Sequence, residues 1–506
     1  MAPYNYDRLS AEDNSFLLME TPCTPMHVAS TQIFEIAPLR RDDGGVDFGA
    51  IKRRTASVLH RIPRYRQKLR WIPFENTPVW IDDEHFEIDY HLRHTSLPRP
   101  GSDDQLKKLS SRIMSQQLDR TRPLWEIWVV EGLDRDRFAL ISKIHHCMID
   151  GIAGADISQI LQSPTPEREI GEAPTYIPRP APSGGELVRD SVLRTLSLPL
   201  RALRSFEAFR REAKDVREEL RTRVDAIRKT VGMQIHRASP SPINGELSPH
   251  KVFDWLTMPL DDVKAVRRAL SCTVNDVVLV VVTGALREFM LQRQVRPEEL
   301  DFRVQTPVSV RQQEERGKLG NRVSTWTLSL PIGEPDPRKQ LEAISPVTRE
   351  LKSSRQALGV ELMLTAMGEM PTALLSATMQ AALGSMNTFI TNVPGPQFPL
   401  YMLGAKMLSL YPQAPLLPGI GLATAVMSYN GQMCWGLNAD PKLVPDLHAY
   451  VEMLRGSFER LAAAAGVTLG RVDAAGSGQR SDAASARKRT ARRSAARPAS
   501  QPTTSA

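Results

Sequence analysis

Apolar and polar residues alternate with a period of two in several short stretches of the chain, which predicts β-strands. Two of these stretches, Leu422–Tyr429 and Gln432–Leu437, flank Asn430-Gly431, which is the strongest β-hairpin signal in the sequence. The other predicted strands are Met26–Phe34, Val79–Tyr90, Pro123–Glu131, Arg137–Ile144, Arg303–Val310, Arg322–Leu330 and Ser385–Val393.

Other stretches repeat apolar residues at helical spacing. The first helix follows a Ser10 cap and has an apolar face at Phe16, Leu17 and Met19. Val277–Met290 is apolar nearly all round, which predicts a buried helix, and Thr273 with Asp276 forms a capping-box pattern at its start. Further helices are predicted from Phe48 to Pro63, over Asp104–Leu118, Leu341–Leu358 and Ala373–Leu383, and over Leu447–Leu461 with Pro445 in the first turn.

Strands and helices mixed in this way predict an α/β fold, and the length of 506 residues predicts more than one unit. Residues 163–185 are rich in Pro and Gly, like a linker, and a basic amphipathic segment follows them. The stripe of apolar residues in that segment fits either packing against the body or lying on a membrane. We therefore divide the chain into a first unit (1–162), a linker and basic segment (163–250), a second unit (251–462) and a disordered basic tail (463–506).

The formal net charge of +8 is concentrated at the periphery of this organisation. Arg471–Ala506 has a net charge of +6 and Arg189–Lys229 one of +5, so the remainder has a net charge of −3. This distribution suits contact of the periphery with an anionic membrane surface, and nucleic-acid binding is not expected.

The four cysteines are scattered and form neither a zinc pattern nor a disulfide framework. No secretory signal is visible at the amino terminus, and the longest apolar run, Val277–Leu286, is shorter than the roughly 20 residues of a transmembrane helix. A cytoplasmic location is therefore expected.

The stretch Ile144–Gly151 contains adjacent histidines, His145 and His146, followed by Asp150-Gly151. It joins the predicted strand Arg137–Ile144 to a helical pattern, so the histidines lie at a strand's carboxyl end, where α/β folds often place function. If the strand continues through both histidines, they point in opposite directions.

Three interpretations of the pair compete: histidines satisfied in a core, a metal site, and a general base. The metal site is weak because consecutive strand residues diverge and no second ligand pattern accompanies them. As a general base, an imidazole would take the proton of a hydroxyl as it attacks an activated carbonyl, such as a thioester. No Gly-x-Ser-x-Gly elbow is present, which favours direct transfer. Asp150 could orient the imidazole or cap the following helix, and the second is favoured.

His145-His146-x-x-x-Asp150-Gly151 resembles the His-His-x-x-x-Asp-Gly motif of the coenzyme A-dependent acyltransferase superfamily. Further segments resemble, in chain order, those of the bacterial wax ester synthase/diacylglycerol acyltransferase family, and the resemblance spans about Leu9 to Leu461. These segments are Leu9–Val28, Pro123–Glu126, Thr273–Val277, Pro307–Arg311 with Gly320-Asn321, and Thr391–Pro396.

The resemblance implies two chloramphenicol-acetyltransferase-like subdomains, each a mixed β-sheet flanked by helices, with a tunnel between them. It assigns the general base to His146, a supporting role to His145 and a mainly structural role to Asp150. Asn275 is a candidate for positioning the acyl carbonyl, and is equally well interpreted as a helix-start residue. The residues expected near the substrates, each with an alternative structural interpretation, are Pro123, Leu124, Trp125, Gly151, Asp276 and Asn392.

The expected activity is transfer of a long-chain acyl group from acyl-coenzyme A to a fatty alcohol or to diacylglycerol, with no metal and no cofactor beyond this co-substrate. Because such acceptors are insoluble, the protein is expected at the inner membrane or at lipid inclusions, as a peripheral protein. Another coenzyme A acyltransferase with a smaller or glycolipid acceptor, and a non-catalytic lipid-surface scaffold, are the alternatives. The sequence leaves open the preferred acceptor, the chain length, the role of the tail and the oligomeric state, of which a homodimer is one candidate.

Overall fold

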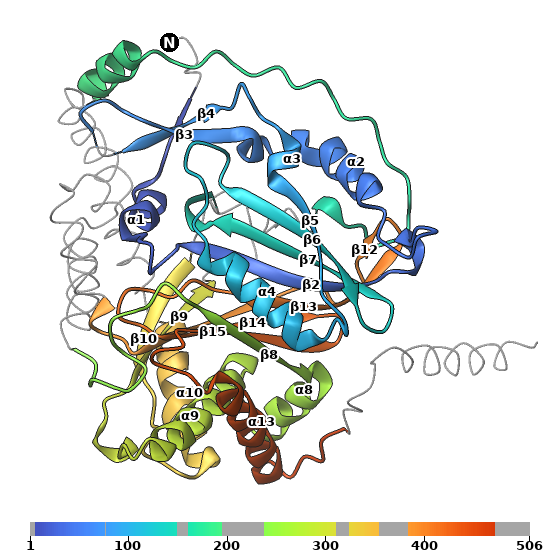
Figure 1. The fold of residues 1–506 in the computed structure, drawn as a ribbon. Coiled ribbons are helices and arrows are strands. Elements are labelled where there is room, and N and C mark those ends of the chain that lie inside the picture. The colour runs from blue at the N-terminus through green and yellow to red at the C-terminus, as the bar shows by residue number, and fades with distance from the viewer. Residues whose placement is uncertain are drawn as a thin grey trace, which may run out of the picture. The chain divides into compact units, whose positions relative to one another are not determined.

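The computed structural model describes residues 6–75, 77–148, 160–194, 237–309, 323–353 and 383–470. All helices and strands named below belong to one compact unit, Met1–Val467. The described residues form two six-stranded sheets and one three-stranded sheet, with helices packed against them (Figure 1). The predicted α/β class with two lobes is confirmed, while the tunnel between the lobes stays a prediction.

In the first six-stranded sheet, the strands predicted at Pro123–Glu131 and Arg137–Ile144 form a β-hairpin. The hairpin consists of β6 (Trp125–Leu133) and β7 (Arg137–His145), and β7 pairs antiparallel with β2 (His27–Glu35) on its other side. An edge strand, β5 (Leu92–Ser96), runs parallel to β6. The strand predicted at Met26–Phe34 is therefore confirmed, and it is a central strand of this sheet.

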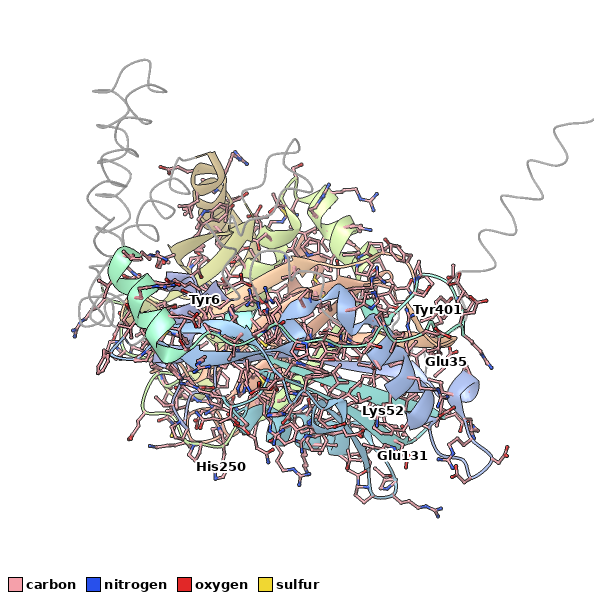
Figure 2. The ribbon with its side chains drawn as sticks, turned by 90° about the horizontal axis from the view of Figure 1, so that it is seen from above. Tyr6, Glu35, Lys52, Glu131, His250 and Tyr401 are labelled. Atoms are coloured by element: carbon pink, nitrogen blue, oxygen red, sulfur yellow. The ribbon has the colours of Figure 1, made fainter. Side chains whose placement is uncertain are left out.

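The other edge of this sheet comes from the far end of the chain. β13 (Ala405–Gln413) pairs antiparallel with β2, and β12 (Tyr401–Met402) pairs with β13. Glu35 at the end of β2 and Tyr401 mark this region in Figure 2. Strands from the predicted second unit (251–462) thus complete the sheet of the first lobe, and the extent of that unit stays a prediction. Buried polar groups contribute to the pairing of β13 with β2. The side-chain amide of Gln413 donates hydrogen bonds to the hydroxyls of Thr31 on β2 and Ser110 on the helix Asp103–Ser115. The other predicted boundaries stay predictions.

A three-stranded sheet joins β1 (Asp7–Arg8), β4 (Pro78–Asp82) and β3 (Gln67–Trp71). The predicted strand Val79–Tyr90 is too long, since β4 ends at Asp82 and α3 (Ile88–His91) follows. Asp83 ends the strand: its carboxylate accepts from the backbone of His85 and binds Lys68 at 2.8 Å. The helix predicted from Phe48 is α2 (Phe48–Val58), continued by short 3₁₀ turns.

The second six-stranded sheet contains the predicted hairpin at Asn430-Gly431, between β14 (Leu422–Tyr429) and β15 (Gln432–Ala439). Both turn residues have positive φ, 44° and 79°, as a two-residue type I′ turn requires. Strand β11 (Thr388–Pro394) runs parallel to β14. The remaining strands are β9 (Arg303–Ser309), β10 (Val323–Ser329) and β8 (Val252–Pro259).

Four helices pack together beside the second sheet, in the lower part of Figure 1. They are α8 (Leu260–Ala269), α9 (Val274–Gln292), α10 (Pro337–Ser353) and α13 (Leu447–Ala464). The predicted burial of α9 is confirmed, because its central residues Val277–Val282 are at most 2% exposed. Pro445 lies before the Asp446 cap of α13 rather than inside its first turn. Helix α4 (Asp103–Ser115) contacts both β2 and β8, and so lies between the sheets.

Among the described residues, no single helix has the length and apolarity needed to cross a bilayer. Helices α8 and α9 meet that test only as a pair, and they are bent by 96° at the break between them. Most of the basic amphipathic segment and of the tail, Gly320-Asn321 and most of the helix predicted at Ala373–Leu383 lie outside the described residues.

Candidate active site

The two histidines follow each other at the end of β7 but belong to different backbone elements. His145 is the last residue of the strand, and His146 begins a 3₁₀ turn, η4 (His146–Met148). The His145 amide donates to the carbonyl of Leu124 at 3.0 Å, and the His146 amide donates to that of Met26 at 2.8 Å. The strand therefore does not continue through both histidines, because it ends at His145. Their side chains nevertheless lie in separate environments.

The side chain of His145 is buried and held inside the protein. It is 1% exposed, and its Nδ1 accepts a hydrogen bond from the backbone N–H of Cys147 at 3.1 Å. An Nδ1 that accepts is unprotonated, so a neutral ring carries its proton on Nε2, which lies 3.5 Å from Oε2 of Glu20. Since both nitrogens are directed at protein groups, His145 is suited to supporting its neighbour.

Glu20 is the centre of a buried polar cluster that the sequence did not reveal as such. Its carboxylate lies 3.3 Å from Nε2 of His27 and receives two hydrogen bonds from Arg120, of 2.6 Å and 3.1 Å. Burial alone would raise the pKa of Glu20, but the neighbouring imidazoles of His145 and His27 lower it well below its usual range. Glu20 and His27 lie in the resemblance segment Leu9–Val28, which was the only signal for them.

Glu20, His27 and His145 also bring three potential metal-ligand atoms within 4.8 Å of one another. Their lone pairs are already engaged, because Arg120 binds the carboxylate and the backbone N–H of Leu118 donates to Nε2 of His27 at 3.4 Å. A divalent cation would have to displace a guanidinium from the same carboxylate. The donor set therefore suits an internal ion-pair network that orients His145, and we assign no metal to it.

His146 has a different environment. It is half-buried, and its ring stacks on Phe16 of α1 (Ala11–Met19), with 3.8 Å between ring centroids and 17° between planes. Its Nδ1 is buried and has no hydrogen-bond partner among the described residues. Burial, with a smaller contribution from nearby His145, lowers the pKa of His146 to about 4, against the opposing effect of the His146 backbone. The ring is thus neutral at pH 7, the form that a general base needs.

Pro123, Leu124 and Trp125 lie in the core of the first lobe, beside the histidines. The indole N–H of Trp125 donates to the carbonyl of Tyr65 at 2.8 Å, and its ring stacks on His91 with 4.6 Å between centroids. Through these contacts, and through the hydrogen bond from the His145 amide to the Leu124 carbonyl, the segment holds the end of β7 in place. Its predicted place along an acyl channel stays a prediction.

Asp276 and Asn275 begin the buried helix α9 in the second lobe. The capping box is confirmed: the Thr273 hydroxyl accepts from the amide of Asp276, and the Asp276 carboxylate accepts from that of Thr273. Asp276 is 1% exposed and also accepts from the Thr348 hydroxyl of α10 at 2.7 Å. Its carboxylate is thus used within the protein. Asn275 is half-buried, and its side chain makes no hydrogen bond among the described residues.

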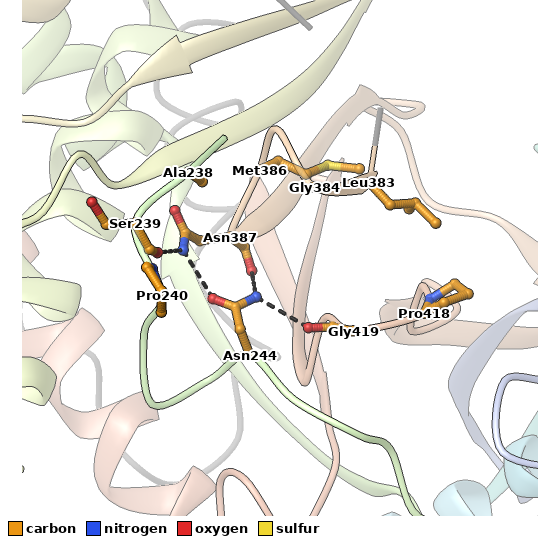
Figure 3. A pocket seen from close by; sticks show the side chains of 10 residues that line it. All are labelled: Ala238, Ser239, Pro240, Asn244, Leu383, Gly384, Met386, Asn387, Pro418 and Gly419. Atoms are coloured by element: carbon orange, nitrogen blue, oxygen red, sulfur yellow. Dashed lines mark hydrogen bonds between the residues drawn. The ribbon is translucent and has the colours of Figure 1, made fainter. Parts of the chain in front are cut away.

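The remaining predicted site residues are less informative. Asn392 is half-buried on β11 and pairs with Val426 of β14, and its role stays a prediction. Asp150 and Gly151 lie outside the described residues. A cavity of about 330 Å³ in the second lobe contains none of the predicted residues, and Figure 3 shows its wall of Asn244 and Asn387, joined by a hydrogen bond of 2.9 Å.

The two-lobed fold is shared with solved condensation domains and with a solved wax ester synthase/diacylglycerol acyltransferase. The starter condensation domain of rhizomide synthetase has this fold, with a TM-score of 0.56, 13% identity and coverage of 93% of this chain and 96% of that chain. The wax ester synthase/diacylglycerol acyltransferase of Marinobacter aquaeolei superposes with a TM-score of 0.63, at 24% identity, over 91% of this chain and 100% of that chain.

The sequence identifies the family among the proteins with this fold. The catalytic-domain model of the wax ester synthase/diacylglycerol acyltransferase family matches residues 9–278, and its C-terminal-domain model matches residues 319–462. A putative diacylglycerol O-acyltransferase of Mycobacterium tuberculosis strain CDC 1551 is 32% identical over 451 residues, which are 87% of each chain. A probable diacylglycerol O-acyltransferase of strain H37Rv is 32% identical over 418 residues, covering 81% of this chain and 86% of the relative. The chain belongs to the wax ester synthase/diacylglycerol acyltransferase family and is an acyltransferase.

Proposed function

We propose that the protein transfers a long-chain acyl group from acyl-coenzyme A to the hydroxyl of a fatty alcohol or of diacylglycerol, with His146 as the general base. The observation that carries the proposal is the difference between the two histidines. His145 is fixed by Cys147 and Glu20, whereas His146 is neutral and has no carboxylate partner among the described residues. The names of the relatives and of the family support the choice of substrates.

The proposed reaction proceeds in a complex of both substrates. Neutral His146 takes the proton of the acceptor hydroxyl as its oxygen attacks the thioester carbonyl, because a free alkoxide cannot accumulate near neutral pH. The tetrahedral intermediate then collapses, the carbon–sulfur bond breaks, and the imidazolium returns its proton to the departing coenzyme A thiolate. An ester and a free thiol leave, the imidazole is neutral again, and no acyl group is attached to the protein.

Two predicted residues have supporting roles in this proposal. Asn275 has an amide side chain without a partner among the described residues, at the amino-terminal end of α9. A helix amino terminus favours negative charge, so Asn275 suits contact with the carbonyl oxygen as it becomes an oxyanion. Asp150 is proposed to have a mainly structural role, as the family resemblance implies.

The insoluble acceptors imply work at a lipid surface. We infer peripheral association with the inner membrane or with lipid inclusions, supported by the net charge of +5 over Arg189–Lys229 and +6 over Arg471–Ala506. Each Lys or Arg near an anionic leaflet contributes about 1 kcal/mol of attraction.

The test measures coenzyme A released from palmitoyl-coenzyme A with hexadecanol or dipalmitoylglycerol, and identifies the ester product by mass spectrometry. Removal of the base in His146→Ala should reduce kcat by about 10²- to 10⁴-fold. His250→Ala, which changes an exposed histidine, is the matched control and should retain wild-type activity. Thiol release with neither acceptor would refute the substrate assignment, and full activity of a folded His146→Ala variant would refute the base assignment.

A further inference from the structure

Phe16 places one aromatic face directly over the ring of His146. We propose that Phe16 is a positioning residue for the reaction: its ring holds the imidazole plane and stabilises the imidazolium that forms when the base takes its proton. The inference rests on the general-base role proposed for His146, and it adds a residue that acts through that base.

The helix that carries Phe16 is fixed at both ends. At its start, the Ser10 hydroxyl accepts from the backbone N–H of Asp13 at 3.0 Å. At its end, the N–H of Glu20 donates to the carbonyl of Phe16 at 3.1 Å. Arg120 links this end to the buried cluster, because it binds the Glu20 carboxylate and also donates to the Leu17 carbonyl at 3.1 Å. The network that holds His145 therefore also holds the ring that covers His146.

The stack has a different energetic value in the two protonation states of His146. Against neutral imidazole, the Phe16 ring supplies dispersion and excludes water from one face. Against imidazolium, it also supplies the electrostatic attraction between a cation and the negative face of an aromatic ring. An interaction that is stronger when the base is charged is stronger in the transition state than in the ground state, so it raises kcat.

The backbone of His146 itself also favours the charged ring, but no described side chain other than Phe16 is placed to do so. His27 and His145 lie beside the Glu20 carboxylate, but among the residues that the structure describes no carboxylate forms an ion pair with His146. The charge that develops on His146 in a half-buried site thus has the π-face of Phe16 as its nearest described side-chain source of stabilisation. The two histidines thus face different side chains at the end of α1: the ring of Phe16 covers His146, and the carboxylate of Glu20, the residue that follows the helix, lies beside His145.

The test compares variants that keep or remove the π-face at position 16. Phe16→Leu and Phe16→Met keep an apolar residue on α1, whereas Phe16→Tyr keeps the aromatic ring. The loss of a cation–π contact should lower kcat by about two- to thirtyfold in the Leu and Met variants, with the KM for palmitoyl-coenzyme A nearly unchanged. Phe16→Tyr should restore kcat.

Leu17→Ala is the matched control on the same helix, because Leu17 is 3% exposed and packs in the core of the first lobe. It should lower the melting temperature while kcat per folded molecule stays at the wild-type value. Wild-type kcat in both Phe16→Leu and Phe16→Met, or a Phe16→Tyr variant as slow as these two, would overturn the inference. Activity retained by His146→Ala would instead overturn the base assignment, so the two failures are distinguishable.

Discussion

The acid dependence of turnover tests the environment of His146 directly. An unperturbed histidine has a pKa of about 6.5, whereas burial lowers the pKa of His146 to about 4. The difference corresponds to a preference of about 3 kcal/mol for the neutral ring. Because the base works only when it is neutral, activity should be present above the lowered pKa and lost as the pH falls through it.

The lowered pKa and the unperturbed pKa of His146 predict the most different activities near pH 5. With a pKa of about 4, roughly 90% of the His146 rings are neutral at that pH, whereas with a pKa of 6.5 only about 3% are neutral. The acid limb of kcat/KM, which reports the free enzyme, should therefore leave the plateau below about pH 5. At pH 5, kcat/KM as a fraction of its plateau value should be about thirtyfold higher than for a base with an unperturbed pKa.

The assay measures coenzyme A by mass spectrometry after an acid quench, at palmitoyl-coenzyme A concentrations below KM and at constant ionic strength. Folding must be checked by circular dichroism at each pH, because burial also lowers the pKa of His27 to about 4, beside Glu20. Protonation of a neutral buried histidine costs stability as the pH falls below about 6.5. An acid limb centred near pH 6.5 in a folded enzyme would refute the burial argument for His146.

Two further substitutions test the supports of the site. Glu20→Gln removes the charge that binds Arg120, so we expect a loss of about 3 kcal/mol in the free energy of unfolding and a lower kcat. Glu87→Gln, which changes an exposed glutamate, is the control. Urea unfolding of Glu20→Gln that matches the wild type would contradict the role of the cluster. Asp276→Asn weakens the cap of α9 and its bond to Thr348. It should cost about 1–2 kcal/mol, measured by the same unfolding, and a change in KM without a loss of stability would indicate substrate contact instead.

The regular elements near the site were largely predictable from local pattern. β2, β6 and β7 alternate apolar and polar residues, and α9 has both its capping box and its apolar composition in the sequence. Strand β13 was not predicted, because it contains Pro412 and because the strand before its Leu403-Gly404 turn, β12, is only two residues long. Its partner β2 is distant in sequence, and local periodicity contains no information on that pairing.

The cluster around Glu20 was unpredictable for a related reason. Glu20, His27 and Arg120 follow no spacing that marks a site, and they meet only because β2 pairs with β7 and the chain after α4 returns to the same edge. Phe16 was predicted as part of the apolar face of a helix, and its stack on His146 depends on where that helix packs. The motif itself identified the two histidines, and only tertiary structure shows how their environments differ.

The pairing of β13 with β2 has a consequence for synthesis of the chain on the ribosome. Gln413 bonds to Thr31 across 382 residues of sequence, so β2 remains an unpaired edge until most of the protein has been made. At about 5–20 residues per second this interval lasts roughly 20–75 seconds. During it the nascent first sheet exposes backbone groups next to the future active site, and an exposed edge of this kind invites aggregation. Chaperone binding to the emerging chain is therefore expected to matter more for this protein than its compact final structure suggests.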